Sequence, residues 1–175
     1  MSIRILTDDE LERVFERTRA HVCGPAIRLM AATGVRVSEV VLVRAGDIDA
    51  GRCELRLRDR YGIPGRVVSI PEELRDVLVR RTGGLKEDEF IFSHPGDAGR
   101  PLVRRTVQKL LSETGRELGI QGVTVTNLRA TRAVRWLEAG TDPRRIRESM
   151  GFRKPRSLER YAALTGGVRI AGGTS

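Results

Sequence analysis

The chain has 175 residues, of which 32 are Lys or Arg and 23 are Asp or Glu, so its formal net charge at neutral pH is +9. This length suits one domain with a sizeable core, and the positive excess favours a polyanionic partner. No stretch approaches the roughly 20 apolar residues of a membrane span, and the first residues lack an apolar secretory segment, so we expect a cytoplasmic protein with no membrane segment.

The N-terminal quarter of the chain carries signals for three helices. A capping box at residues 7–10 opens the first, and apolar residues follow it at helical spacing. The second is expected over residues 25–33 and should end at Gly34, because glycine suits the left-handed conformation just after a helix. Ser38 is the expected start of a third helix, which would carry the apolar residues 40–42.

The middle of the chain predicts a β-hairpin followed by a helix. Residues 53–58 and 66–70 alternate in polarity or favour β-branched side chains around a turn at residues 61–65, which indicates two antiparallel strands. Pro71 lies before two glutamates and a helical apolar pattern, so it should start the next helix.

A short apolar run at residues 90–92 predicts a strand or extended segment. The Pro/Gly-rich residues 94–101 that follow predict a surface loop. Apolar positions within residues 103–118 then mark one face of a long helix.

Three more helices are expected near the C-terminus. The first carries Arg129 and ends at Gly140. The second begins at Asp142 and Pro143, a strong N-cap and first-turn pair. The last opens at residues 155–157 and holds Tyr161.

These elements together predict a mainly α protein with a small antiparallel β-sheet, an α+β fold. Residues 1–165 are expected to form one domain. The Gly-rich residues 166–175 are expected to form a flexible C-terminal tail.

The excess of arginine over lysine has two possible explanations. Only three of the basic residues are lysines, and a guanidinium binds phosphate through two parallel hydrogen bonds. A GC-rich genome that replaces lysine by arginine would explain the same composition. Cys23 and Cys53 form no CxxC motif, so we expect no structural zinc site and two buried, reduced thiols.

Four short stretches carry residues suited to chemistry on phosphates. They are TGVRVSE at residues 33–39, TNLR at 126–129, MGF at 150–152, and Tyr161. The pattern resembles the active site of the tyrosine recombinases, the phage integrase family. In that family an arginine follows a Thr-Gly turn, a second box reads His-x-x-Arg, a third reads Leu-Gly-His, and the nucleophilic tyrosine lies nine residues after the last histidine.

The resemblance covers the chain from about Leu6 to Leu164 and keeps this spacing. It implies the tyrosine recombinase catalytic-domain fold, double-stranded DNA as partner, and a site-specific recombinase that works without cofactor or metal.

The chemistry of phosphodiester transfer explains why these residue types would be needed. The phosphate gains charge in its transition state, and fixed cationic donors such as Arg36 and Arg129 stabilise that charge. The resemblance implies that Tyr161 is the nucleophile and forms a 3′-phosphotyrosyl link. A tyrosine hydroxyl is weakly nucleophilic at neutral pH, and two arginines supply the positive field that it needs.

The departures from the family pattern fall on proton transfer. Thr126 and Phe152 occupy the positions of the two family histidines. The family also places a lysine in the hairpin turn, where it protonates the leaving 5′-oxygen, and this turn has none. Arg60 is the nearest basic residue in the turn, and Lys154 is a candidate substitute from another loop. The candidate DNA contacts are Arg36, Arg60, Arg129, Arg153 and Lys154.

Each residue also has a purely structural interpretation. Arg36 could serve only to pair with Glu39 or Asp47 and have no part in catalysis, and Tyr161 could be an ordinary core aromatic.

Three functions are therefore considered. The first is a DNA strand transferase acting through Tyr161. The second is a catalytically weakened accessory protein that binds DNA with the same fold, which the missing histidines and lysine favour. The third is a nicking and closing enzyme like type IB topoisomerases. The chain begins where the family's catalytic domain begins, so we expect either a catalytic fragment or a minimal recombinase, with homo-oligomers forming on DNA rather than as stable protein-only assemblies.

Overall fold

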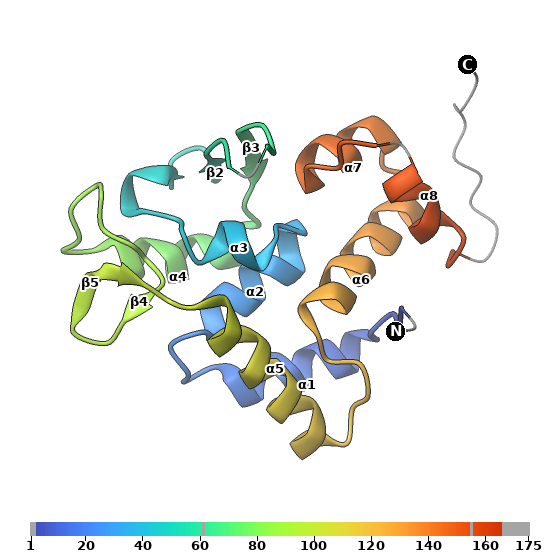
Figure 1. Cartoon of the computed structure of the whole chain (residues 1–175), viewed down its shortest axis with the longest axis horizontal. Helices are drawn as coiled ribbons and strands as arrows, with labels where there is room; N and C mark the ends of the chain where they lie inside the picture. The colour runs from blue at the N-terminus through green and yellow to red at the C-terminus, as the bar shows by residue number, and fades with distance from the viewer. Residues whose placement is uncertain (1–2, 61, 155, 166–175) are drawn as a thin grey trace.

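The structure, a computed structural model, describes residues 3–60, 62–154 and 156–165. Its helices are α1 (Asp8–Thr18), α2 (Gly24–Thr33), α3 (Val37–Val40), α4 (Glu72–Thr82), α5 (Arg104–Leu118), α6 (Val125–Glu138), α7 (Pro143–Met150) and α8 (Arg156–Ala162), with a short 3-10 helix at Ala45–Asp47. Its strands are β1 (Ile48–Asp49), β2 (Glu54–Leu57), β3 (Arg66–Ser69), β4 (Ser93–His94) and β5 (Asp97–Pro101). Helices dominate and the sheets are small and antiparallel, so the α+β prediction is confirmed (Figure 1).

The first helices follow their local signals. Thr7 caps α1 by accepting a hydrogen bond from the Glu10 amide, and the Glu10 carboxylate accepts one from the Thr7 amide in return. Helix α2 ends at Gly34, whose φ of 67° lies in the left-handed region that glycine adopts without strain. Helix α2 packs against α1, α4 and α6, which places it at the centre of the molecule.

The third helix differs from the prediction. It begins at Val37 rather than Ser38 and ends at Val40, after only four residues. Arg36, with extended backbone, occupies the cap position, and its amide donates to the Glu39 carboxylate over 2.7 Å. The Glu39 carboxylate therefore fixes the cap residue from within the first turn, and Ser38 lies inside the helix.

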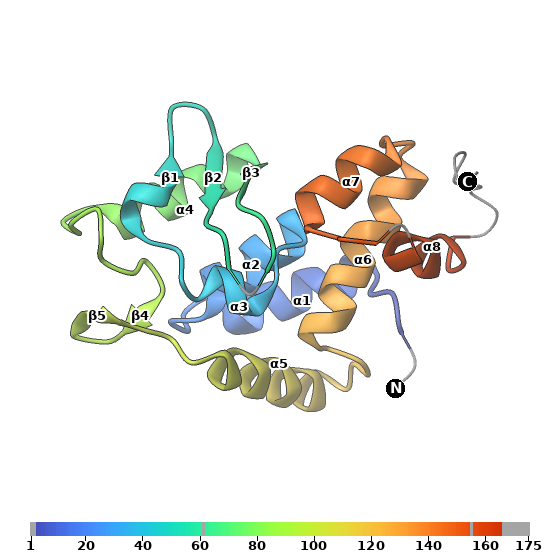
Figure 2. The same cartoon turned by 45° about the horizontal axis from the view of Figure 1, so that its top comes forward.

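The predicted hairpin is present, and a short strand adds to it. Strands β2 and β3 pair antiparallel with Leu55 opposite Val68, and β1 pairs with the other edge of β2. Strand β1 has only two residues, which is too short for a periodic pattern to reveal. Figure 2 shows this sheet above α2 and α3 and beside α7.

Residues 94–101 are a second hairpin, not the loop that was expected. His94 pairs with Asp97 across Pro95 and Gly96, and Gly96 has a φ of 80°. The same Pro-Gly pair that suggested a loop is the two-residue connection of a hairpin, because proline fixes the first turn position and glycine accepts the second.

The apolar side chains form two clusters. The larger is built by α1 to α5 and the three-stranded sheet, and the smaller by α6, α7 and α8. The expectation of two buried thiols is right for Cys23, which is fully buried, and wrong for Cys53. Cys53 is half-buried because it lies in the β1–β2 turn with a φ of 52°.

None of the helices in the described ranges is long and apolar enough to cross a membrane. The predicted C-terminal tail, residues 166–175, lies outside the described residues, as do Tyr61 in the hairpin turn and Pro155 before α8.

Candidate active site

The two predicted phosphate-binding arginines converge on one point between the clusters. Arg36 lies at the start of α3, and its side chain donates to the carbonyl oxygens of Gly151 (2.8 Å) and Met150 (3.3 Å). Arg129 lies on α6 and donates to the same Met150 oxygen (3.2 Å) and to the oxygen of Gly34. The bonds of Arg36 to the end of α7 and of Arg129 to the end of α2 each join segments more than 90 residues apart.

Tyr161 lies beside this pair on α8. Its ring is 5.7 Å from that of Phe152, and the Arg129 guanidinium carbon is 5.4 Å from the Phe152 ring centre. Phe152 therefore packs between the arginine and the tyrosine. Tyr161 is 6% exposed, so its ring does belong to the core, as the structural interpretation held. Within the described residues its hydroxyl makes no hydrogen bond, which leaves the oxygen unconstrained by a protein partner.

Burial makes both guanidinium charges costly. It lowers the pKa of Arg129 to about 10, with a further lowering by Arg36 and an opposing effect of Tyr161 and Glu39. Burial also lowers the pKa of Arg36, against the attraction of Glu39. Both groups still carry their charge at neutral pH. A site that holds two partly desolvated cations so close together favours an anion between them.

Arg66 completes the charge arrangement, and sequence reasoning missed it. Its guanidinium binds both oxygens of Glu39, over 2.6 Å and 3.1 Å, and its Nε donates to the Ser149 oxygen over 2.8 Å. The Arg66 side chain is 11% exposed. A signal existed, because Arg66 lies two residues before the buried Val68 and so shares the inward face of β3.

The Glu39 carboxylate is held as an anion by its partners. Burial alone would raise its pKa, but hydrogen bonds from Arg66 and from the Arg36 amide, with the charges of both arginines, keep the pKa below its ordinary value. Its contact with the Arg36 side chain is long, at 3.7 Å. Asp47, the other suggested partner of Arg36, pairs with Arg58 instead.

The other predicted site residues lie around this centre. Thr126 is exposed on the first turn of α6, beside a groove that Ile3 and Arg160 also line. Arg60 forms a backbone bridge with Ile63 in the hairpin turn, and Lys154 is exposed in the loop before α8. In the described structure no hydrogen bond or ion pair joins Thr126, Arg60 or Lys154 to Tyr161 or to the two arginines.

Arg153 reaches from the loop after α7 to the hairpin turn. Its Nη1 lies 3.3 Å from the position that a Cβ on Gly62 would occupy. Arg153 is thus the predicted DNA contact that links the two loops beside the site.

The comparisons with known proteins agree with this geometry. The family model described as the phage integrase family matches residues 4–166. The tyrosine recombinase XerC of Roseiflexus castenholzii is 32% identical over 148 residues, covering 79% of this chain and 46% of the relative. The chain spans about half the length of the curated relatives it matches.

Solved structures show the same fold. The XerA recombinase crystal structure has a TM-score of 0.79 at 25% identity and covers 95% of this chain and 62% of that one. The Tn1549 transposon integrase, solved in complex with a circular intermediate DNA, has a TM-score of 0.74 at 15% identity and covers 92% and 61% of the two chains.

Proposed function

Because the chain belongs to the phage integrase family, we propose that it is a site-specific DNA recombinase that cleaves and rejoins DNA strands through a 3′-phosphotyrosyl link to Tyr161. The observation that carries the proposal is the convergence of Arg36 and Arg129 on the Met150 carbonyl beside Tyr161. The XerC relative is named a tyrosine recombinase, and the Tn1549 integrase was solved with DNA, which supports double-stranded DNA as the partner.

The proposed reaction conserves the phosphodiester energy. The phenolic oxygen of Tyr161 attacks phosphorus and loses its proton, a new P–O bond forms, and the bond to the 5′-oxygen breaks. The 5′-oxygen leaves as a hydroxyl after it takes up a proton. Attack by a 5′-hydroxyl of another strand reverses these steps, so neither a nucleotide nor a metal is consumed.

The arginines would supply the electrostatic part of catalysis. A guanidinium has five N–H donors, and the hydrogen bonds to Gly34, Met150 and Gly151 leave some of them for a phosphate. These backbone contacts hold the two cations in place before the substrate arrives. Donors that need no reorganisation stabilise a transition-state charge most effectively.

Proton transfer would differ from that of the family pattern. We propose Lys154 or Arg60 as the source of the proton for the leaving oxygen, with Thr126 and Phe152 at the histidine positions. Phe152 can pack against Tyr161 but cannot donate a hydrogen bond to phosphate. This one observation favours a second candidate function, a DNA-binding accessory protein with weakened catalysis.

Covalent capture on nicked DNA tests the proposal. A pool of random-sequence duplexes, each with a nick that lets the short 5′ product diffuse away, would trap the phosphotyrosyl adduct as a band that resists detergent. We expect the adduct with the natural chain and none with Tyr161→Phe, since only the nucleophilic oxygen is removed. Adduct formation by Tyr161→Phe would contradict the proposal. A gel shift without adduct would support the accessory protein, and relaxed plasmids without recombinants would support a nicking and closing enzyme.

A further inference from the structure

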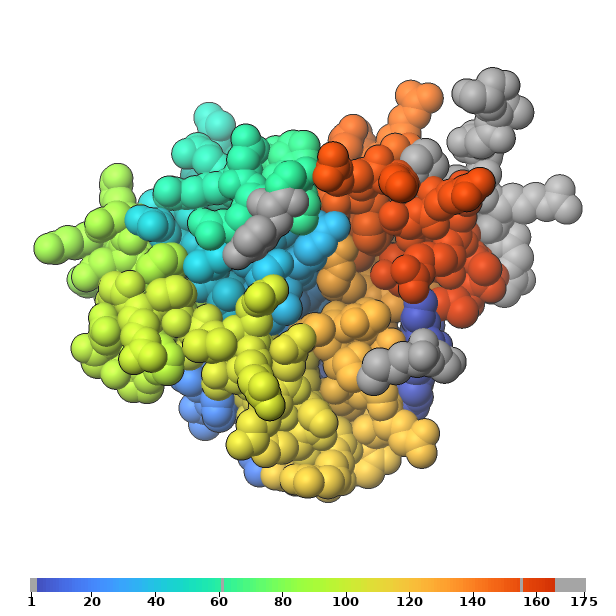
Figure 3. Space-filling model, viewed as in Figure 1, coloured from blue at the N-terminus to red at the C-terminus, as the bar shows by residue number. Residues whose placement is uncertain are grey.

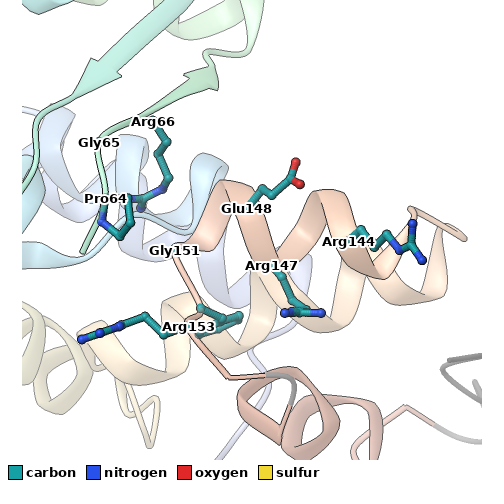
Figure 4. Close-up of a pocket in the computed structure, with 9 residues that line it drawn as sticks. Pro64, Gly65, Arg66, Arg144, Arg147, Glu148, Gly151 and Arg153 are labelled. Carbon is teal, nitrogen blue, oxygen red and sulfur yellow. The ribbon is translucent and has the colours of Figure 1, made fainter. Parts of the chain in front are cut away.

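A cavity of about 450 Å³ opens between the hairpin turn and the C-terminal end of α7. Figure 4 shows its walls: Pro64 to Arg66 on the hairpin side, α7 on the other, and Arg153 below. In Figure 3 the hairpin and α7, in green and orange, lie side by side on one face of the molecule. The volume is within the range of sites that bind small molecules or groups.

The charge of the cavity is strongly positive. Arginines at positions 66, 144, 147 and 153 line it, and Glu148 is its one acid. Arg66 is neutralised by Glu39 and acts as a wall. Glu148 points to the other side of α7 from Arg147 in Figure 4. In the described ranges, Arg144, Arg147 and Arg153 have no carboxylate within 4.0 Å.

Among the arginines that line the cavity, Arg147 has a buried donor atom without a partner in the described residues. Its side chain is half-buried, and its Nε atom is buried with no hydrogen-bond partner among the described residues. An unsatisfied buried donor costs free energy, and more so when it is charged. An anion in the cavity that accepts from this guanidinium would offset the cost of burying its charge. The planar donor pattern of arginine suits a phosphate best.

The cavity adjoins the candidate active site through shared residues. Gly151 and Phe152 line it, the Gly151 carbonyl accepts from Arg36, and the Phe152 ring packs beside Arg129 and Tyr161. An anion here would therefore be a near neighbour of a phosphate held by Arg36 and Arg129. Successive phosphates of one DNA strand provide such a pair.

We propose that this cavity binds a backbone phosphate of the DNA substrate, next to the phosphate that Tyr161 attacks. The inference rests on the proposed function for the identity of the ligand. Arg147 is the principal contact, and Arg153 closes the site from the hairpin side. The subsite would fix the register of the strand and so position the attacked phosphate, because phosphate contacts orient DNA without reading its sequence.

Three arginine variants of equal charge test the subsite. Arg147→Gln and Arg153→Gln remove a cation from the cavity, and Arg80→Gln removes one from the exposed end of α4, outside it. Non-covalent affinity for a random-sequence duplex is measured over a salt series. We expect the two cavity variants to bind about tenfold more weakly than Arg80→Gln near 0.1 M salt, with a salt slope less negative by about 0.9.

Each other result has a definite meaning. Cavity variants that bind like Arg80→Gln would overturn the subsite. If inorganic phosphate binds the natural chain and not the cavity variants, while duplex affinity equals that of Arg80→Gln, the cavity serves a free anion and the DNA assignment is wrong. Should Arg147→Gln unfold, the exposed Arg153→Gln decides. Loss of affinity as expected, with no covalent adduct formed by the natural chain, would support the subsite and contradict only the strand-transfer function.

Discussion

The Glu39 carboxylate joins two arginines from different elements at the centre of the candidate active site. It accepts from Arg66 on β3 and from the amide of Arg36 at the start of α3. Through Arg66 it is also tied to the end of α7, where Ser149 supplies a carbonyl. In the proposed reaction Glu39 would therefore be a positioning residue, since it holds the backbone of Arg36 and the neighbouring Arg66 in place.

Stability should depend on this carboxylate above a defined pH. The pKa of Glu39 is lowered in the folded state, so its contribution is complete above the ordinary value of 4.5 and is lost as the pH falls through the lower, folded value. We expect Glu39→Gln to reduce the free energy of unfolding by about 3 kcal/mol at neutral pH, since it leaves Arg66 without its charge partner. The difference from the natural chain should shrink below pH 4.5. Urea titrations of both chains at several pH values measure this difference in the free energy of unfolding.

A matched exposed carboxylate provides the control. The Asp49 carboxylate accepts a hydrogen bond from the Arg52 amide over 2.9 Å, an acceptor that asparagine keeps, and it lies 3.9 Å from the Arg52 side chain, with both side chains largely exposed. Asp49→Asn should change stability little at any pH, because exposed pairs contribute little. A Glu39→Gln difference that stays constant from neutral to acid pH would contradict the charge assignment.

The leaving-group proton concerns single residues as well. If Lys154 supplies it, Lys154→Ala should slow cleavage of ordinary DNA, and a bridging 5′-sulfur in the substrate should restore the rate. The reason is that a thiol, with a pKa near 8.5 for a cysteine-like group, leaves without a proton donor. Single-turnover assays measure the cleavage rates of the ordinary and the sulfur-containing substrate, and the ratio of the two rates shows the rescue.

Arg60→Ala is the companion variant in the hairpin turn. A guanidinium could assist through electrostatic stabilisation or a relayed water, and the sulfur rescue would then follow Arg60→Ala instead. Rescue of one variant identifies the residue that acts on the leaving oxygen. Unchanged cleavage of ordinary DNA by both variants would show that neither residue does.

The residue pattern located the centre of the site but not its support. The spacing of Arg36, Arg129 and Tyr161 followed a family motif, and the structure brings these residues together. Arg66 and Arg147 carry no motif. Strand alternation places Arg66 on the inward face of β3, but its partners Glu39 and Ser149 lie on other elements, and the cavity beside Arg147 is formed by the hairpin and α7 together. Such partners come from distant parts of the chain, and local periodicity contains no information about them.

At the scale of elements, glycines end several helices, and two of these glycines contact the arginines of the candidate site. Helices α2, α5 and α7 all end at a glycine in the left-handed region: Gly34, Gly119 and Gly151. The surroundings of these glycines differ. A Cβ on Gly151 would lie 2.9 Å from the Arg66 guanidinium carbon and 3.0 Å from Arg36 Nη1, whereas one on Gly119 would meet no atom within 4 Å.

This contrast separates backbone strain from damage to the site. Gly151→Ala and Gly119→Ala should each lower stability by about 1–2 kcal/mol, because both place a side chain in the left-handed region. Gly151→Ala should also slow covalent capture by about 100-fold, since it displaces the arginines that would position the phosphate. Gly119→Ala should cleave normally. Thermal unfolding and adduct formation are measured on the same preparations, and equal cleavage by the two variants would contradict the assigned geometry.

The elements themselves were predicted to different degrees. Capping boxes, glycine stops and Asp142-Pro143 are local signals, and helices α1, α2 and α7 follow them closely. Strands β1 and β4 have two residues each and exist because of their partners, so no local pattern could specify them. The start of the short α3 was misplaced because the Glu39 carboxylate, which also binds Arg66, accepts a hydrogen bond from the Arg36 amide and so makes Arg36 the cap residue.

For the whole molecule, the candidate site lies where the two apolar clusters meet. Arg36 and Arg66 come from the larger cluster's elements, and Arg129 and Tyr161 from the smaller one's helices. The hydrogen bonds of the arginines to Gly34, Met150 and Gly151 cross this boundary. Cations concentrated at one junction give a charged surface that a polyanion can cover in one binding event.

The net charge of +9 and these arginines together set the expected salt dependence of DNA binding. A phosphate between Arg36 and Arg129 and another beside Arg147 make at least two neutralised phosphates. Each contributes about −0.9 to the slope of log K against log salt, so the slope should be about −1.8 or steeper. The slope arises from release of condensed counterions, which sequence-specific contacts do not change, and a random duplex is therefore a sufficient probe. Fluorescence anisotropy over a salt series, with the Tyr161→Phe chain to keep binding non-covalent, measures it. A flat dependence would rule out the DNA-binding interpretation, and with it both the strand transferase and the accessory protein.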